Sequence, residues 1–156
     1  MAGPTASVII REPLSAEQRS KVADLVSSKA SQVEGMDFWV NDRPFLWSIG
    51  EDYPGELAEE DLSELIGWQP QDQVIFAAMC NDQVDHRILA ELCIEVARLL
   101  DGLVDFGGWL GDLEPSDVGQ LWASPYESIS GPVFSHLGTP EFLAWWLKQP
   151  NFRMVK

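Results

Sequence analysis

The feature that most constrains the fold is a continuous apolar run, QVIFAAMC, at Gln73–Cys80, followed directly by a long helical pattern. A run of this length without alternation is typical of a strand in the middle of a sheet, buried on both faces. Asn81 or Asp82 can cap the helix that follows, which we expect over Val84–Leu100. The apolar stripe of this helix is predicted to consist of Val84, Ile88, Leu92, Val96 and Leu99. The chain therefore has to cover a central strand with at least one long amphipathic helix.

A strand and a helix are also predicted near the start of the chain. Ala6–Arg11 is short and β-branched and ends before Pro13, as a first strand would. Ser15 can then cap a helix over Ala16–Ser31, and Gln18 can return the hydrogen bond in a capping box. The fold is thus expected to open with a strand and a helix.

Further extended and helical runs follow along the chain. Met36–Val40 and Pro44–Ile49 are joined by Asn41-Asp42-Arg43, a composition that predicts a hairpin turn. Thr139-Pro140 combines a capping residue with proline at the first helical position, so a last helix should run to about Lys148. The other expectations are a short helix over Leu57–Ile66, an extended run over Leu103–Phe106, and a long connection over Gly111–Gly138 with room for a short helix or strand.

The order of these elements predicts an α+β fold. A strand, a helix, two strands, a short helix, a strand, a long helix, a strand and a last helix favour a mostly antiparallel sheet with helices packed on one face. The pattern contains ferredoxin-like elements with additions. The chain has 156 residues, of which 46% are hydrophobic, so we expect one domain over residues 1–156.

The lack of a recognisable targeting signal and the pattern around the two cysteines both favour a reducing compartment. The first residues lack a basic segment before an apolar stretch, and no window reaches the roughly 18 apolar residues of a membrane span. We therefore predict a cytoplasmic protein that does not enter a membrane. Cys80 and Cys93 lie in apolar patterns without metal-ligand spacing, so we expect two reduced, buried thiols.

The net charge of −15 is distributed unevenly along the chain. Residues 44–147 hold nineteen acids and only two bases, a local balance of −17, whereas the two ends together carry six acids and eight bases. Nucleic-acid binding requires a basic stripe and is disfavoured. A one-signed field steers an oppositely charged protein into contact, so the distribution favours a basic protein partner.

The sequence offers few groups for catalysis or metal binding. Histidine is the commonest general base near neutral pH, and the chain has only His86 and His136. His86 falls at a helix start with Asp82 and Asp85, where acids serve capping, and His136 has no nucleophile-elbow serine beside it. No metal-ligand spacing occurs, so we predict no catalytic residue, metal site or cofactor. A fortuitous Ca²⁺ or Mg²⁺ site among the carboxylates of Glu51–Glu64 is the alternative.

The acidic segment Gly50–Trp68 is the candidate binding site. It holds seven carboxylates and no lysine or arginine, although like charges one turn apart on a helix repel. Rigid aromatic side chains beside charges serve as anchors in protein interfaces. A solvated helix face that keeps the protein soluble is the alternative interpretation. We predict that a basic partner contacts Trp47, Glu51, Asp52, Tyr53, Glu56, Glu59, Glu60, Asp61, Glu64 and Trp68.

Three stretches carry a resemblance to known proteins: the opening MAGPTASVIIREPLS, the central LLDGLVDFGG and the closing TPEFLAWWLKQPNFRMVK. In these stretches the chain resembles a family of small acidic bacterial proteins of unknown function. It is also similar to the immunity proteins paired with polymorphic or type VI secretion toxins, including those that guard against restriction-endonuclease-like nuclease toxins. The resemblance implies a protein that binds and blocks a cognate toxin, with no catalytic residues.

The sequence thus favours an immunity protein that neutralises a bacterial toxin, in particular a nuclease effector, through an acidic surface. A nuclease presents cationic side chains to the phosphates of its substrate, and a carboxylate-rich surface can bind those same side chains. One alternative is a small enzyme, recognised by a deep pocket that joins His86 or His136 to paired acids. The other is an acidic regulatory adaptor with a non-toxic basic partner. The pattern defines no oligomeric state.

Overall fold

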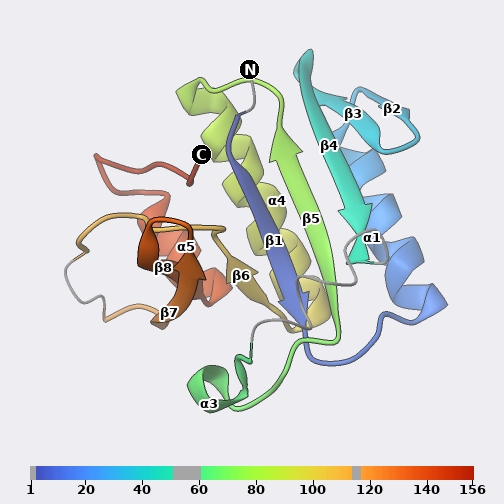
Figure 1. Cartoon of the computed structure of the whole chain (residues 1–156). Helices are drawn as coiled ribbons and strands as arrows, with labels where there is room; N and C mark the ends of the chain where they lie inside the picture. The colour runs from blue at the N-terminus through green and yellow to red at the C-terminus, as the bar shows by residue number, and fades with distance from the viewer. Residues whose placement is uncertain (1–2, 51–60, 114–116) are drawn as a thin grey trace.

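The computed structural model describes residues 3–50, 61–113 and 117–156, and these residues form one antiparallel sheet and four helices (Figure 1). The strands are β1 (Thr5–Ile10), β2 (Gln32–Glu34), β3 (Asp37–Val40), β4 (Arg43–Ile49), β5 (Asp72–Ala78), β6 (Leu103–Asp105), β7 (Leu121–Ser128) and β8 (Gly131–Gly138). The helices are α1 (Ala16–Lys29), α3 (Ser63–Ile66), α4 (Gln83–Leu100) and α5 (Pro140–Trp146). Within the described residues, no helix is both long and apolar enough to cross a membrane.

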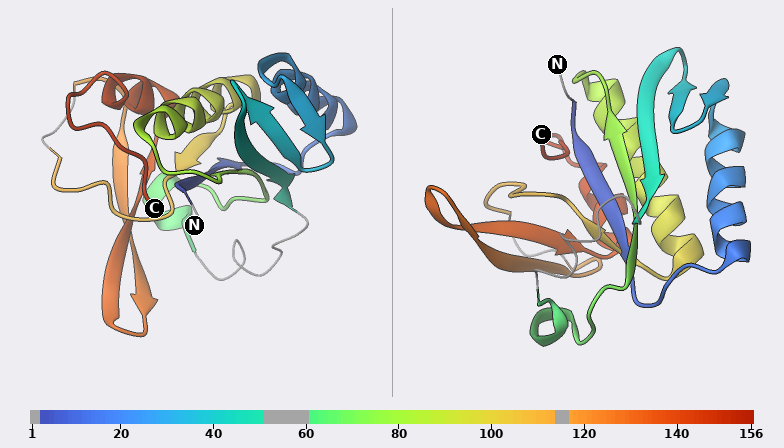
Figure 2. Two further views of the ribbon diagram at one scale, coloured as in Figure 1. Left: turned by 90° about the horizontal axis from the view of Figure 1, so that it is seen from above. Right: turned by 45° about the vertical axis from the view of Figure 1, so that its right-hand side comes forward.

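Six of these elements form the ferredoxin-like unit that the sequence predicted. In chain order they are β1, α1, β4, β5, α4 and β6, and their strands lie side by side as β4-β5-β1-β6. Helices α1, α4 and α5 lie on one face of the sheet, as the view from above shows (Figure 2). The additions extend the sheet at both edges, because β3 and β2 follow β4 while β8 and β7 follow β6. The α+β class is therefore confirmed.

Local signals set the ends of several elements as predicted. The hydroxyl of Ser15 accepts a hydrogen bond from the Gln18 N–H at 3.1 Å, and the Gln18 side chain accepts one from the Ser15 N–H at 2.9 Å. This capping box starts α1. The turn between β3 and β4 consists of Asn41 and Asp42 at φ values of 50° and 63°, which suit a two-residue hairpin loop. Thr139 caps α5 with its side chain.

Helix α4 covers the centre of the sheet, but its buried stripe differs from the predicted one. Val84 is 49% exposed and Leu99 is 40% exposed. Four residues turn an α-helix by more than a full circle, so a row at that spacing drifts away from the core at both ends. The buried stripe instead includes Leu89, Leu92, Cys93, Val96 and Leu100. Both thiols are free, as predicted, and burial raises the pKa of Cys93 to about 12, whereas Cys80 is only half-buried.

The face of the sheet away from the long helices carries a second, smaller apolar cluster. Its buried members are Ile9 of β1, Leu62 just before α3, and Leu137 of β8. Leu65, Ile66, Trp68, Leu103 and Trp122 pack against these three residues. The short helix α3 therefore lies against the face of the sheet that α1, α4 and α5 leave uncovered, beside the base of β7 and β8.

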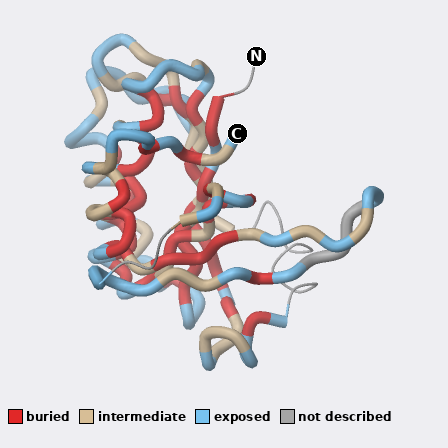
Figure 3. Tube along the Cα trace, turned by 90° about the vertical axis from the view of Figure 1, so that its left-hand side faces the viewer, coloured by how far each residue is buried: buried red, intermediate tan, exposed pale blue. Residues whose placement is uncertain are grey.

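The segment expected to be a long connection contains a β-hairpin, formed by β7 and β8, which we call the arm. The arm projects from the rest of the sheet (Figures 2 and 3). Its loop, Ile129-Ser130, leads into Gly131 at φ 107°. Pro125 and Pro132 favour a loop by their composition, yet Pro125 lies in an outer strand, where a missing N–H is tolerated. The Ser130-Gly131 pair was the signal for the hairpin turn.

Candidate functional site

The described part of the acidic segment is a short helical turn held by its own side chains. The Asp61 carboxylate accepts hydrogen bonds from the Ser63 hydroxyl at 2.5 Å and from the Ser63 N–H at 3.1 Å. These bonds, that of the hydroxyl above all, lower the pKa of Asp61 below its usual range. Glu64 is exposed one residue further, and Gly67 ends the helix in the left-handed conformation at φ 85°. Asp61 and Glu64 thus both lie at the surface.

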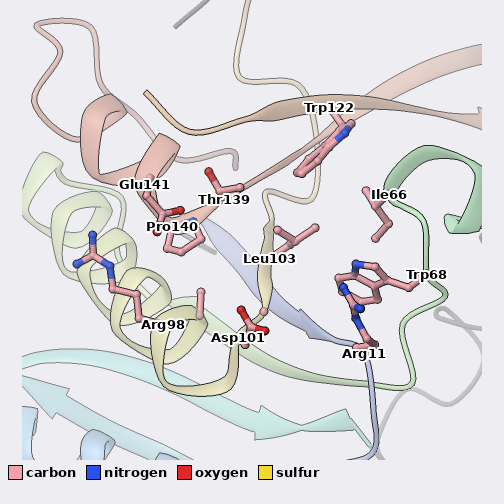
Figure 4. A pocket seen from close by; sticks show the side chains of 12 residues that line it. Arg11, Ile66, Trp68, Arg98, Asp101, Leu103, Trp122, Thr139, Pro140 and Glu141 are labelled. Atoms are coloured by element: carbon pink, nitrogen blue, oxygen red, sulfur yellow. The ribbon is translucent and has the colours of Figure 1, made fainter. Parts of the chain in front are cut away.

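Trp68 follows α3 and lines a groove of about 410 Å³ (Figure 4). The guanidinium carbon of Arg11 lies 5.2 Å from the centre of the Trp68 ring, within the range of a cation–π interaction. Trp122 of β7 lines the groove from the arm, and Leu103 of β6 contributes apolar surface between the two tryptophans (Figure 4). The groove therefore joins the acidic segment to the arm.

Charged side chains of both signs line the same groove. Arg11 comes from the end of β1, Arg98 and Asp101 from the C-terminal end of α4, and Glu141 from the first turn of α5. All four are exposed. Asp101 stands at the C-cap of α4 with φ 52°. Because charged groups surround apolar walls, the groove suits a side chain with a long apolar stem and a charged end.

The structure separates two of the predicted aromatic anchors. Trp47 in β4 pairs with Phe76 and packs against the main core below the long helices. Trp68 packs against the second cluster on the opposite face of the sheet. Successive side chains of a strand point to opposite faces, and Trp47 shares the core-facing set with Phe45 and Ile49. Trp47 and Trp68 therefore do not belong to one surface.

Three of the ten predicted site residues lie together around α3, namely Asp61, Glu64 and Trp68. Only Trp68 lines the groove. Trp47 lies apart from these three, against the main core. The other six predicted residues lie outside the described part of the chain: Glu51, Asp52, Tyr53, Glu56, Glu59 and Glu60.

Both histidines accept hydrogen bonds from backbone N–H groups. His86 Nδ1 accepts from the Met154 N–H at 2.9 Å, so its Nε2 carries the proton and donates to Asn81 Oδ1 at 3.0 Å. His136 Nδ1 accepts from the Leu110 N–H at 3.0 Å. Burial lowers the pKa of both rings, which favours the neutral form that these bonds require. His86 therefore fastens the C-terminal segment, and His136 fastens the chain that follows β6.

Basic residues near the start of the chain are paired with acids around α1 and α4. Arg43 donates to the fully buried Asp85 at 2.5 Å and to Asp82 at 2.6 Å, and its guanidinium lowers the pKa of Asp85. Lys29 contacts Glu95 at 2.9 Å. The other pairs in this region are Lys21 with Glu17 and Arg19 with Asp72. On this side of the molecule, opposite charges lie close enough to offset one another.

The stretch 99–147, which contains β6, the arm and α5, has the opposite character. It holds seven acids and no lysine or arginine. Asp112, Asp117 and Glu141 are exposed, and within the described residues none of the three forms an ion pair. The acidic character that the sequence indicated therefore falls on the β6, arm and α5 side of the fold.

Sequence reasoning missed a group of aromatic rings beside the arm. The Trp109 ring stacks on His136 with a centroid separation of 4.0 Å and lies 6.1 Å from the Phe134 ring. Phe134 is 51% exposed and Trp109 is 42% exposed. Phe134 and His136 alternate along β8, and that period of two was the available signal. We call Trp109, Phe134 and His136 the aromatic ridge.

Among the described residues, no three His, Cys, Asp or Glu side chains are grouped to hold a metal ion.

Comparisons with known proteins place the chain in a family. Neither curated proteins nor solved structures gave a match. One protein-family model covers residues 2–156. With nearly its whole length matched, the chain belongs to DUF6368, a family of unknown function.

Proposed function

We propose that this protein binds a basic protein partner and blocks it without catalysing a reaction, as an immunity protein does to a toxin. The favoured partner is a nuclease effector of a polymorphic or type VI secretion system. Such an enzyme must present cations to the phosphates of its substrate. An acidic inhibitor can cover those cations directly.

The observation that carries the proposal is the separation of charge across the fold. Bases near the start of the chain are paired around α1 and α4, as Arg43 is with Asp85. Glu64 of α3 and, within residues 99–147, Asp112, Asp117 and Glu141 are exposed, and neither segment contains a lysine or arginine. An excess of acids of this kind accelerates association with a cationic protein and makes the rate depend on salt.

The groove supplies the second requirement of a tight complex, which is slow dissociation. Trp68, which follows α3, and Trp122 of β7 present aromatic surface next to the charged residues Arg98, Asp101 and Glu141. Rigid aromatic side chains in a partly desolvated pocket are typical binding hot spots. In this proposal, charge brings the partner to the surface, and the tryptophans hold it there.

The arrangement of the histidines supports binding over catalysis. The Nδ1 atoms of His86 and His136 each accept a hydrogen bond from a backbone N–H. Removing either bond would leave a buried N–H without an acceptor. The carboxylates that line the groove, Asp101 and Glu141, are grouped with arginines and tryptophans. An enzyme of the carboxylate and histidine class would need these acids beside an available imidazole.

The test is coexpression with the product of each gene that flanks the gene for this protein. We expect one flanking product to arrest growth, to lose its toxicity when this protein is present, and to form a complex measurable by calorimetry. If no flanking product is both toxic and bound, the proposal is rejected. A flanking product that is bound but harmless would instead identify an adaptor.

A charge-reversal pair locates the binding surface on the molecule. Glu64→Lys on α3 should slow association and reduce its salt dependence, because it places a cation on the side that meets the partner. Glu91→Lys on α4 makes the same charge change at an exposed position and is the matched control. Equal on-rates for the two variants would show that the α3 acids only solvate the surface.

A further inference from the structure

We propose that the aromatic ridge is a docking site for an arginine-bearing segment of the basic partner. This inference rests on the proposed function and adds a second contact surface to it, on the other side of the arm from α3. The ridge lies apart from the groove, because Phe134 and His136 alternate with Leu137, which belongs to the cluster beneath α3.

The exposure of the ridge and of the arm is unusual for side chains of their size. Phe134 and Trp109 are 51% and 42% exposed, and Ile129 at the end of the arm is 109% exposed. Phe134 and Ile129 belong to the arm, which extends away from the body of the sheet (Figure 3). Clustered exposed apolar side chains mark interaction sites more often than scattered ones.

The ridge is rigid, which favours its use as an anchor. Trp109 is held against the His136 ring at 4.0 Å, and His136 is itself fixed by the Leu110 N–H at 3.0 Å. A side chain that is already ordered loses little conformational freedom when a partner binds. The neutral His136 ring supports Trp109 without placing a positive charge near the site.

Charge decides which partner fits this surface. The ridge lies within residues 99–147, which contain seven acids and no base, and Asp112 is exposed three residues after Trp109. Arg153 of the C-terminal segment approaches from outside this stretch, near Gly111. With Arg153 included, the stretch still has seven acids against one base, so a cationic segment is favoured over an acidic or uncharged one.

The chain shows the same chemistry twice within itself. The guanidinium of Arg11 lies over Trp68 at 5.2 Å, and that of Arg87 lies over Phe152 at 5.9 Å. Arginine is the cation found most often on aromatic faces, and Phe134 is about half exposed to solvent. An arginine of the partner can stack on the ridge while a nearby carboxylate meets its charge.

The experiment uses the full-length protein and a capped hexa-arginine peptide as the probe. The indole N–H signals are followed by two-dimensional NMR at low salt, with Trp109→Phe to assign the Trp109 signal. We expect a saturable shift of the Trp109 indole with hexa-arginine and none with hexaglutamate. If hexa-arginine binds and moves other indoles while Trp109 stays still, the inference is overturned.

Three substitutions sharpen the result. Phe134→Ala should weaken hexa-arginine binding about threefold to fivefold through loss of the exposed ring. Met36→Ala, at a residue 57% exposed in the turn between β2 and β3, is the matched control and should leave the affinity unchanged. Arg153→Gln should strengthen binding about twofold, because a competing cation is removed. Equal affinities for Phe134→Ala and Met36→Ala would overturn the inference.

The outcomes separate this inference from the proposed function. If a toxic flanking product binds equally well to the parent and to Phe134→Ala, the ridge is not a docking site and the proposed function stands. If no flanking product binds while hexa-arginine still shifts the Trp109 indole signal, the ridge remains a docking site and the proposed toxin partner is rejected. If Phe134→Ala only converts a dimer to a monomer in sedimentation, the occupant is a second copy and the inference is wrong.

Discussion

The ferredoxin-like unit and the arm use aromatic rings and charges in opposite ways. In the unit and in strand β3 beside it, Phe76 and Phe38 are fully buried, and Arg43 neutralises the buried Asp85. Beside the arm, Phe134 and Trp109 are exposed and Asp112 has no ion-pair partner among the described residues. Residues of the same types therefore stabilise the fold in one region and remain available for contacts in the other.

The largest expected contrast comes from the same substitution made in both regions. Phe38→Ala removes a buried ring that stacks on Phe45 at 5.5 Å, and should lower the free energy of unfolding by about 3–5 kcal/mol. Phe134→Ala on the arm should lower it by no more than about 1 kcal/mol. Urea unfolding measures both. Phe38→Leu serves as a milder variant should Phe38→Ala fail to fold. Similar losses of unfolding free energy in both regions would contradict the difference between them.

The next effect concerns the ion pair that joins the start of β4 to α4. Arg43→Met leaves the buried Asp85 without its partner, so we expect a lower melting temperature at pH 7. Arg43 holds the pKa of Asp85 below its ordinary value of 3.8, so the stabilisation is present above that pH and is lost as pH falls through the folded pKa. Melting curves of parent and variant should therefore converge in acid. A gap that stays constant with pH would contradict this account.

A smaller effect should follow acidification, because each region contains one buried histidine. Burial lowers the pKa of His86 and His136 below 6.5, so the unfolded chain binds more protons below that pH. Stability should then fall as pH drops through 6.5. His86→Asn and His136→Asn should each flatten the dependence measured by urea unfolding between pH 7 and 5. If neither variant changes the slope of stability against pH, groups other than these two histidines cause it.

The smallest effect tests the groove. Arg11→Gln removes the cation over Trp68 and should lower the free energy of unfolding by about 0.5 kcal/mol. The emission of Trp68, isolated as the difference between the parent and Trp68→Phe, should change in the same variant. Lys148→Gln, an exposed basic residue outside the groove, is the control. An unchanged Trp68 emission would mean that the guanidinium does not stay on the ring in solution.

The ferredoxin-like unit was largely predictable because its signals are local. Ser15 with Gln18, Asn41 with Asp42, and the apolar run at Gln73–Cys80 each determine a cap, a turn or a strand without reference to distant residues. The alternation of helices and strands then restricts the topology to few choices. These features were read correctly from the chain.

The candidate site was less predictable because it depends on which face each side chain takes. Trp47 and Trp68 flank one acidic segment in sequence, yet the pleat of β4 sends Trp47 into the main core. Trp109 joins Phe134 only through the pairing of β6 with β8 across 24 residues of intervening chain. Contacts of that range follow from strand order, which the pattern of single residues does not contain.

The two ends of the sheet bear on how the protein behaves at high concentration. One outer strand, β2, is three residues long, and the other, β7, carries Pro125 near its middle. Short outer strands and prolines hinder a neighbouring chain from adding its own strand. Growth into fibrils or ribbons by edge-to-edge stacking is thus opposed at both ends, even though the arm extends freely into solvent.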